Sequence, residues 1–287
     1  MLASMDDTAA PVRACKIVRY RESLSEDRMD AVTVEEPLEI RVGGAALAVT
    51  MRTPGQDFEL AAGFLVAEGI VESPAQIARI EHCRETASPE EEGNVLIVRM
   101  TGPPPDLDRA RRLHLTTSSC GLCGKGSIEA VMRKFPPVAS QARLDAAILF
   151  GLPRRLEEGQ TSFGQTGGLH GAGIFDLAGS PLVIREDVGR HNAVDKAVGR
   201  LFLDGRLPLS EAILLVSGRA SFEIVQKAVA AGLPVVAAVS APSSLAVELA
   251  VESNVLLAGF LREGGFNLYA GENRLLSRPD GARGATG

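Results

Sequence analysis

Three short apolar segments in the second half of the chain limit the folds open to it. Ala212–Val216, Val235–Val239 and Val255–Phe260 are rich in aliphatic residues and too short for typical helices. Stretches suited to helices separate them, at Phe222–Ala231 and Ser244–Val251. Short strands that alternate with helices are typical of a largely parallel sheet, because parallel neighbours need a crossover connection. The uninterrupted apolar character of the strands indicates that helices cover both faces of this sheet.

The rest of the second half adds elements to the same α/β domain. In chain order we expect a helix over Leu144–Glu157 interrupted near Pro153, a hairpin of strands Gly173–Leu177 and Leu182–Arg185, a helix over Ala193–Leu203, and a last strand at Phe266–Tyr269. No internal repeat is visible. The second half is therefore expected to be one doubly covered α/β domain.

The first half has the patterns of a smaller α+β domain. Leu38–Val42 and Leu47–Met51 alternate apolar and polar residues on either side of Gly43-Gly44. Two glycines between alternating segments predict a tight hairpin, because the turns that fit need positive φ angles. Asp57 is expected to cap a helix that ends near Glu68, and Asn94–Met100 is expected to be a further strand.

These patterns divide the chain into four stretches. They are a disordered tail over 1–14, an N-terminal α+β domain over 15–137 that ends in the cysteine-containing loop (116–127) and its helix, an α/β domain over 138–275, and a loose tail over 276–287.

Composition excludes several classes of protein. The formal net charge is −6, aromatic residues are 4% and tryptophan is absent, so neither an electrostatic grip on nucleic acid nor a base-stacking surface is expected. No apolar run is long enough to cross a membrane and the N-terminus lacks a signal-peptide pattern, so we expect a cytoplasmic protein without a membrane partner. Four cysteines are too few for a disulfide scaffold in a chain of 287 residues.

Small polar turns follow the expected strands of the second half. They are Glu186–Asn192, Ser217–Ser221 and Ser240–Ser244. Such turns gather at the carboxyl edge of an α/β sheet, where the starts of helices favour phosphate. Arg190, Arg219 and Arg262 add positive charge to this edge, so a phosphate-bearing ligand is expected. The alternative is that the turns are ordinary helix caps with surface arginines.

The four histidines differ in their neighbours. His191 lies between Arg190 and Asn192 at a strand end, which favours ligand contact over simple packing. His170, in a glycine-rich stretch, fits either role, and His82 and His114 have no supporting neighbours.

The stretch Thr116–Ser127 reads TTSSCGLCGKGS and holds two cysteines, Cys120 and Cys123. A structural zinc site would need two such pairs, and a zinc deaminase would need a His-x-Glu motif that is absent here. Thioredoxin-like exchange would follow an apolar strand, which this pair does not. Lys125 and a helix that starts near Gly126 would lower the pKa of a thiol, so an activated thiolate that carries sulfur fits best.

Several segments together resemble the FdhD/NarQ family of formate dehydrogenase accessory sulfurtransferases. In chain order the matching segments are Ser118–Lys125, Thr166–His170, Glu186–Lys196, Ser217–Arg219 with Val225–Lys227, Ser240–Ala246 and Gly259–Arg262. The resemblance extends from about Glu36 to Tyr269.

The resemblance implies a fold and an activity. The larger domain would be a cytidine-deaminase-like three-layer α/β/α domain without the zinc site, and the protein would form a homodimer. It would take persulfide sulfur from a cysteine desulfurase and pass it to the molybdenum bis(molybdopterin guanine dinucleotide) cofactor, as formate dehydrogenase requires. No cofactor would be permanently bound and no metal would be held. The alternative is a chaperone that binds the cofactor without sulfur transfer.

The resemblance also implies roles for particular residues. Cys120 would carry the persulfide and Cys123 would support it. The residues expected at the guanine-nucleotide-type cofactor are Phe260, Leu261, Arg262, Glu263, Gly264 and Gly265, with Arg219 and His191 nearby. Asp187 is a further candidate for the same pocket. Which formate dehydrogenase is served, and whether the metal is molybdenum or tungsten, does not follow from the sequence.

Overall fold

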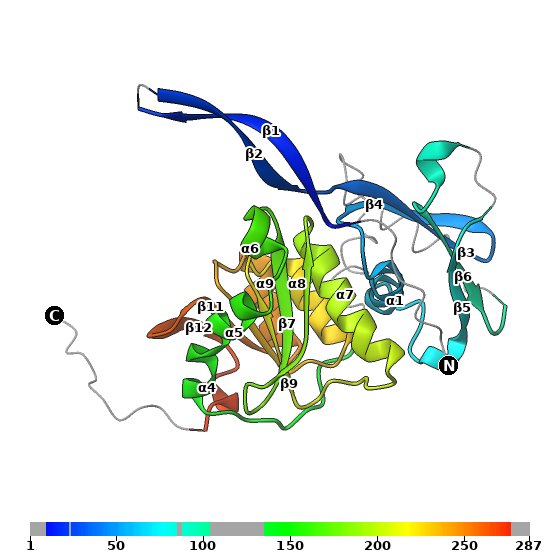
Figure 1. Ribbon diagram of the computed structural model, residues 1–287. Helices are drawn as coiled ribbons and strands as arrows, with labels where there is room; N and C mark the ends of the chain where they lie inside the picture. Colours follow the sequence, from blue (N-terminus) through cyan, green and yellow to red (C-terminus); the bar gives the residue numbers. More distant parts are fainter. Residues whose placement is uncertain (1–9, 23, 85–87, 104–134, 277–287) are drawn as a thin grey trace.

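The structure is a computed structural model that describes residues 10–22, 24–84, 88–103 and 135–276 (Figure 1). It is a mixed α/β molecule with three sheets: a two-stranded ribbon, a four-stranded sheet and a six-stranded sheet. Within the described residues, no helix is long and apolar enough to span a bilayer.

The two-stranded ribbon is formed by β1 (Val12–Arg21) and β2 (Leu24–Thr33). The strands pair antiparallel in an unbroken register from Val12↔Thr33 to Arg21↔Leu24. In Figure 1 the ribbon, in dark blue, projects away from the rest of the molecule. Strand β1 begins inside the stretch 1–14 that we expected to be a disordered tail, so that expectation does not hold for residues 12–14.

The four-stranded sheet has the order β4-β3-β6-β5. Its strands are β3 (Glu36–Val42), β4 (Ala45–Arg52), β5 (Ile77–His82) and β6 (Val95–Met100). The hairpin expected at Gly43-Gly44 is confirmed, and both glycines have positive φ angles, 59° and 84°. Short 3-10 turns lie at Pro74–Gln76 and Pro89–Glu91.

Helix α1 (Asp57–Ala67) follows β4, as expected, but it is not capped by Asp57. The N-cap is Gln56, in a left-handed conformation, and no side chain caps the helix. Asp57 is the first helical residue, and its carboxylate is held by Arg52, whose Nε and Nη2 each lie 3.0 Å from a carboxylate oxygen. The cap prediction was wrong because a buried arginine binds this carboxylate more strongly than the amides of the first turn.

The six-stranded sheet has the order β12-β11-β10-β9-β7-β8. Its strands are β7 (His170–Asp176), β8 (Pro181–Asp187), β9 (Ala212–Val216), β10 (Val235–Ala238), β11 (Leu256–Arg262) and β12 (Gly265–Ala270). Only the pairs β9–β10 and β10–β11 are parallel, and the other three pairs are antiparallel. The expectation of a largely parallel sheet is thus corrected: a parallel centre carries antiparallel strands on both sides.

Helices cover both faces of this sheet, which gives three layers. The helices of this half are α4 (Ala146–Phe150), α5 (Leu152–Glu158), α6 (Phe163–Thr166), α7 (Arg190–Leu203), α8 (Phe222–Ala230) and α9 (Ser244–Glu252), followed by a 3-10 turn at Glu272–Arg274; α6 lies against β2 of the ribbon. Ile213 and Leu215 of β9 pack with α4 and α5, whereas Leu214 and Val216 pack with α7 and α8. Successive side chains along a strand therefore pack into two separate cores, one on each face of the sheet. The interruption expected near Pro153 is present: α4 ends and α5 begins at Gly151.

Helix α1 packs directly on α7, and two glycines allow the contact. A Cβ atom on Gly63 would lie 1.9 Å from the carbonyl oxygen of Asp195, and one on Gly199 would lie 1.8 Å from that of Glu59. One apolar core consequently includes residues of both halves, such as Leu60 and Val198. The four-stranded sheet and the six-stranded sheet are joined through these two helices.

Candidate functional site

The turns expected to gather at one edge of the large sheet do so. Strands β8, β9, β10 and β11 end at this edge and the antiparallel β7 begins there, at His170. Backbone hydrogen bonds tie neighbouring turns together: Ser217 N donates to Gly171 O, Ser240 N to Gly218 O, and Phe260 N to Ser240 O. We call this set of turns the carboxyl-edge crevice; it consists of residues 187–192, 217–221, 240–244 and 260–265.

Two helices begin at the crevice without a side-chain cap. Helix α7 starts after Gly189, and helix α8 starts after Ser221, whose hydroxyl makes no capping hydrogen bond. Helix α9 differs, because Ser243 accepts a hydrogen bond from Ala246 N. The first-turn N–H groups of α7 and α8 therefore keep the partial positive charge that favours a phosphate.

Arg190 and His170 lie together beside Gly218. A Cβ atom on Gly218 would be 3.4 Å from His170 Nδ1 and 3.9 Å from Arg190 Cβ. Arg190 Nε is buried and has no hydrogen-bond partner among the described residues. Burial, and next the positive charge of Arg190, lower the pKa of His170, so its ring is neutral at neutral pH. A guanidinium with unused hydrogen-bonding capacity beside a neutral imidazole suits an anionic ligand.

His191 connects two of the turns. Its Nε2 lies 2.8 Å from Glu223 Oε2 and 3.3 Å from Ser221 Oγ, both in the first residues around α8. The hydrogen bond from His191 lowers the pKa of Glu223. This nitrogen of His191 is therefore engaged within the protein. Arg219, in the same turn region, is exposed.

The segment Phe260–Gly265 lies at the end of β11, next to the turn at Ser240. Phe260 has a φ angle of 53° and its side chain is 45% exposed, at a shift in the β11–β12 register. A positive φ is strained for an aromatic residue and often marks a functional position. Leu261 is buried in the core, while Glu263 and Gly264 are exposed. Arg262 Nη1 donates to Val239 O and Leu261 O, at 2.6 and 2.7 Å.

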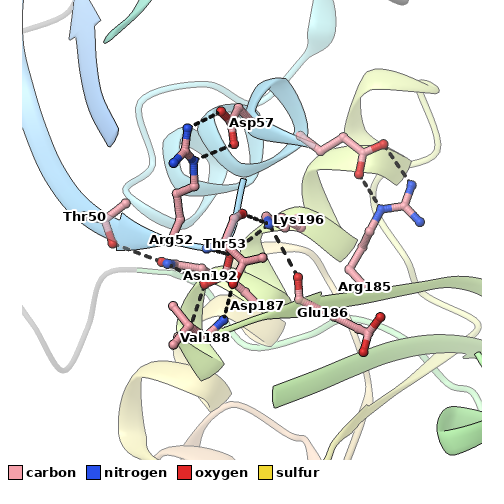
Figure 2. Close-up of polar contacts among 12 residues, drawn as sticks. Thr50, Arg52, Thr53, Asp57, Arg185, Glu186, Asp187, Val188, Asn192 and Lys196 are labelled. Atoms are coloured by element: carbon pink, nitrogen blue, oxygen red, sulfur yellow. Dashed lines mark hydrogen bonds and ion pairs between the residues drawn. The ribbon is translucent and has the colours of Figure 1, made fainter. Parts of the chain in front are cut away.

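A buried polar network holds the turn that follows β8 (Figure 2). Asp187 is fully buried and lies 2.8 Å from Lys196 Nζ, which is itself 1% exposed. The carboxylate also accepts hydrogen bonds from Thr53 N at 3.1 Å, Gly189 N at 2.8 Å and Asn192 Nδ2 at 3.0 Å. With its oxygens so engaged, Asp187 positions the turn rather than meeting a ligand.

The same network reaches the four-stranded sheet. Asn192 Nδ2 donates to Met51 O at 2.7 Å, and Lys196 Nζ donates to Thr53 O at 2.8 Å. Thr50 Oγ1 donates to Asn192 Oδ1 at 3.2 Å. These hydrogen bonds attach the residues at the end of β4 to the start of α7, where Arg190 lies. The sequence carried one hint of this network, because Asn192 and Lys196 place polar side chains at helix positions that are buried.

A cavity of about 650 Å³ lies next to this network, with Thr53 in its lining. Its lining includes Gly55, Gln56, Thr161, Arg185 and Glu186. Arg185 is paired with Glu59, and the Glu186 carboxylate accepts hydrogen bonds from the first amides around α6. The charges of this lining are therefore used inside the protein, whereas Arg190 Nε at the carboxyl-edge crevice has no partner among the described residues.

Cys120 and Cys123 lie within 104–134, outside the described residues. In the remaining described stretches, no three His, Cys, Asp or Glu residues are grouped so as to hold a metal ion.

Comparison with known proteins gives consistent matches over most of the chain. The model of the FdhD/NarQ family matches residues 33–276. The sulfur carrier protein FdhD of Streptomyces avermitilis is 52% identical over 280 residues, covering 94% of this chain and 97% of that protein. The protein of the same name from Mycolicibacterium paratuberculosis is 54% identical over 256 residues, covering 86% and 93%.

A solved structure shares the fold. It is described as that of a formate dehydrogenase accessory protein from Desulfotalea psychrophila, and it superimposes with a TM-score of 0.74. The alignment covers 93% of this chain and 100% of that one at 24% sequence identity.

Proposed function

This chain belongs to the FdhD/NarQ family, and from that premise we propose that it is a sulfurtransferase for formate dehydrogenase. Cys120 takes up persulfide sulfur from a cysteine desulfurase, and the acceptor is the molybdenum bis(molybdopterin guanine dinucleotide) cofactor. The name of the relatives, sulfur carrier protein, supports the first half of this proposal. The proposal includes the homodimer and the cytoplasmic location expected from the sequence.

The loading step needs one thiolate and one persulfide. The Cys120 thiolate attacks the outer sulfur of the donor persulfide, a new S–S bond forms on Cys120, and the donor cysteine leaves as a thiolate. Sulfur and electrons balance without an added oxidant. Lys125 and the helix expected to start near Gly126, read from the sequence, favour the thiolate form.

The carboxyl-edge crevice is the proposed acceptor site. The observation that carries this step is the buried Arg190 Nε without a partner among the described residues, beside the uncapped starts of α7 and α8. These groups match the phosphates of a guanine dinucleotide. Phe260, with its exposed ring, is proposed to contact the base, and Arg219 to add charge at the rim.

Two residues of the expected set act indirectly in this proposal. Leu261 supports the Phe260–Gly265 segment from the core. His191 holds the α7 and α8 turns together through Glu223, so it orders the phosphate-binding amides.

The first experiment tests loading. The chain is incubated with a cysteine desulfurase and cysteine, and intact mass spectrometry with peptide mapping follows. We expect one reductant-sensitive sulfur atom on the peptide that holds Cys120, retained in Cys123→Ala and lost in Cys120→Ala. Absence of added sulfur with an active desulfurase would contradict sulfur carriage and favour the alternative, a chaperone that only binds the cofactor.

The second experiment tests the crevice. Binding of GDP, as a probe for the guanine dinucleotide, is measured by calorimetry for the unmodified chain and for Arg190→Ala. We expect a loss of about ten-fold or more in affinity, because a charge-assisted contact of about 1.5–3 kcal/mol is removed. Arg154→Ala, which removes an exposed arginine on α5, is the matched control and should bind normally. Equal affinity of all three proteins would place the nucleotide elsewhere.

A further inference from the structure

Two pairs of charged or polar side chains link helices α7 and α8 near their starts. In the outer pair, His191 Nε2 lies 2.8 Å from Glu223 Oε2. In the inner pair, Lys227 Nζ lies 2.6 and 2.7 Å from the two carboxylate oxygens of Asp195. On each helix the two residues are four positions apart, so the pairs are separated by about one helical turn. We call these four residues the interhelical ladder.

The inner pair is almost fully enclosed. The side chains of Lys227 and Asp195 are 11% and 4% exposed. Burial raises the pKa of the Asp195 carboxyl, and the positive charge of Lys227 opposes this shift. Because one ammonium group donates to both carboxylate oxygens, the contact fixes direction as well as distance.

The order of charges in the ladder favours a single register of the two helices. The carboxylate of the outer pair is on α8, whereas that of the inner pair is on α7. A shift of α8 by one turn, about 5.4 Å, would bring Glu223 against Asp195. Two carboxylates in contact repel each other, so the shifted register is disfavoured.

The ladder adds directional contacts to the packing of these helices. Helices α7 and α8 share the core on one face of the sheet and lie side by side in Figure 1. They touch each other much less than α1 and α7 do. Because apolar packing is non-directional, the polar pairs define the position of α8 relative to α7 more closely than packing does.

The outer pair lies in the first turns of both helices, whose uncapped starts are at the crevice. The axes of packed helices are about 8–10 Å apart. One phosphate group, with hydrogen bonds of about 2.9 Å, reaches the N–H groups of one helix start. Two linked phosphates can reach both starts, provided that the helices keep their spacing.

We propose that Asp195 and Lys227 are positioning residues for the acceptor site, because their ion pair keeps the starts of α7 and α8 at the spacing that one diphosphate group bridges. The inference rests on the proposed function, in which the crevice receives a guanine dinucleotide, and it extends the role given to His191. Asp195 and Lys227 act through the helices and do not touch the ligand. A diphosphate is therefore bound in preference to a monophosphate.

Calorimetry with GDP and GMP tests this preference with the full chain. The unmodified protein should bind GDP at least about ten-fold more tightly than GMP, because the second phosphate adds charge-assisted contacts. Asp195→Ala and Lys227→Met should each lower this ratio of affinities at least about five-fold, since the second helix start is no longer in place. Lys227→Arg keeps the ion pair and should restore most of the ratio. Partial unfolding weakens the binding of both nucleotides equally, so the ratio separates positioning from stability.

The two variants also separate positioning from simple charge. Removing the carboxylate of Asp195 would by itself strengthen the binding of the more highly charged GDP, whereas removing the ammonium of Lys227 would weaken it. Positioning predicts a fall of the ratio in both variants. Asp204→Ala is the matched control, because its ion pair with Arg200 lies within α7 and away from α8, and it should keep the unmodified ratio.

Glu223→Gln provides the same test at a position that tolerates substitution. Its side chain is 38% exposed, so the variant should fold, and the ratio should fall at least about two-fold although a negative charge is lost. An unchanged or raised ratio in Asp195→Ala and Glu223→Gln, with GDP still bound, would overturn this inference alone. Absence of GDP binding by the unmodified chain would instead contradict the acceptor site of the proposed function, and this inference with it.

Discussion

Strands of the large sheet and strands of the ribbon have the same backbone geometry but opposite surroundings. Every side chain of β9 is buried, because helices cover both faces of the sheet. In β1 and β2, by contrast, the side chains are exposed or at most half-buried. Hydrogen-bonded pairing alone therefore does not tell how much a strand contributes to stability. The contribution depends on what covers its faces.

Ion pairs give the largest expected contrast between these regions. Asp187→Ala leaves Lys196 buried without its counter-charge, so we expect a loss of about 3–5 kcal/mol in the free energy of unfolding. Asp27→Ala removes an exposed partner of Lys16 in the ribbon and should change it by less than about 1 kcal/mol. Urea denaturation in dilute solution measures both. Similar losses for the two variants would show that the ribbon pair is as protected as the buried one.

Leucine truncation makes the same comparison for apolar side chains. Leu214→Ala opens a cavity in the sheet core and should cost about 2–5 kcal/mol. Leu24→Ala removes a side chain that is 76% exposed and should stay within about 0.5 kcal/mol of the unmodified chain. Thermal and urea denaturation of the two variants, at protein concentrations too low for association, provide the measurement. A cost for Leu24→Ala comparable to that for Leu214→Ala would mean that the monomer itself covers the ribbon.

Two glycines extend the comparison of enclosed and open positions to the helices. Gly63→Ala forces a methyl group against the backbone of α7, so we expect a loss of about 1–3 kcal/mol. Gly164→Ala, in α6, meets open space and should be neutral or stabilising by up to about 1 kcal/mol. Unfolding curves of the two variants test whether the α1–α7 contact is as close as the backbone indicates. A neutral Gly63→Ala would show that the helices can move apart without cost.

The smallest expected effect is the pH dependence of stability at the half-buried contact between His191 and Glu223. The hydrogen bond from His191 lowers the pKa of Glu223 below its ordinary value of 4.5. The folded state therefore holds this proton less tightly than the unfolded chain. The resulting stabilisation is complete above the ordinary value and is lost as the pH falls through the lower folded pKa.

The comparison of the unmodified chain with Glu223→Gln isolates this contribution. Because the Glu223 side chain is 38% exposed, we expect the unmodified chain to be more stable by at most about 1 kcal/mol near neutral pH. The difference should shrink below about pH 4.5, as Glu223 becomes protonated. A constant difference for Glu223→Gln would exclude the carboxylate as its cause.

The comparison also explains which parts of the fold the sequence predicted. Burial imposes apolar side chains, so β9, β10 and β11 were recognisable from Ala212–Val216 and its counterparts. The ribbon was missed because no core selects its residues, and Leu24–Thr33 reads as a polar segment. The position of β7 was missed for another reason. Alternation marks a hairpin of β7 and β8, but it does not say that β7 inserts beside β9.

The candidate site was predictable to a similar extent. The turns at the carboxyl edge follow from strand order, and they were found. Whether a polar residue meets ligand or protein depends on contacts far apart in the chain, such as Asp187 with Thr53. Sequence spacing does not reveal such contacts, which is why the expectation for Asp187 did not include its partners Thr53 and Lys196. The roles of Cys120 and Cys123 remain predictions, since both lie outside the described residues.

The close crossing of α1 and α7 also bears on how such a protein can be rearranged. The core that contains Leu60 and Val198 belongs to both halves, and Gly63 and Gly199 fit only the backbone of the opposite helix. An exchange of either half for an unrelated one would leave the other with an exposed core and a mismatched surface. The two halves are therefore one module, and recombination can move them only together.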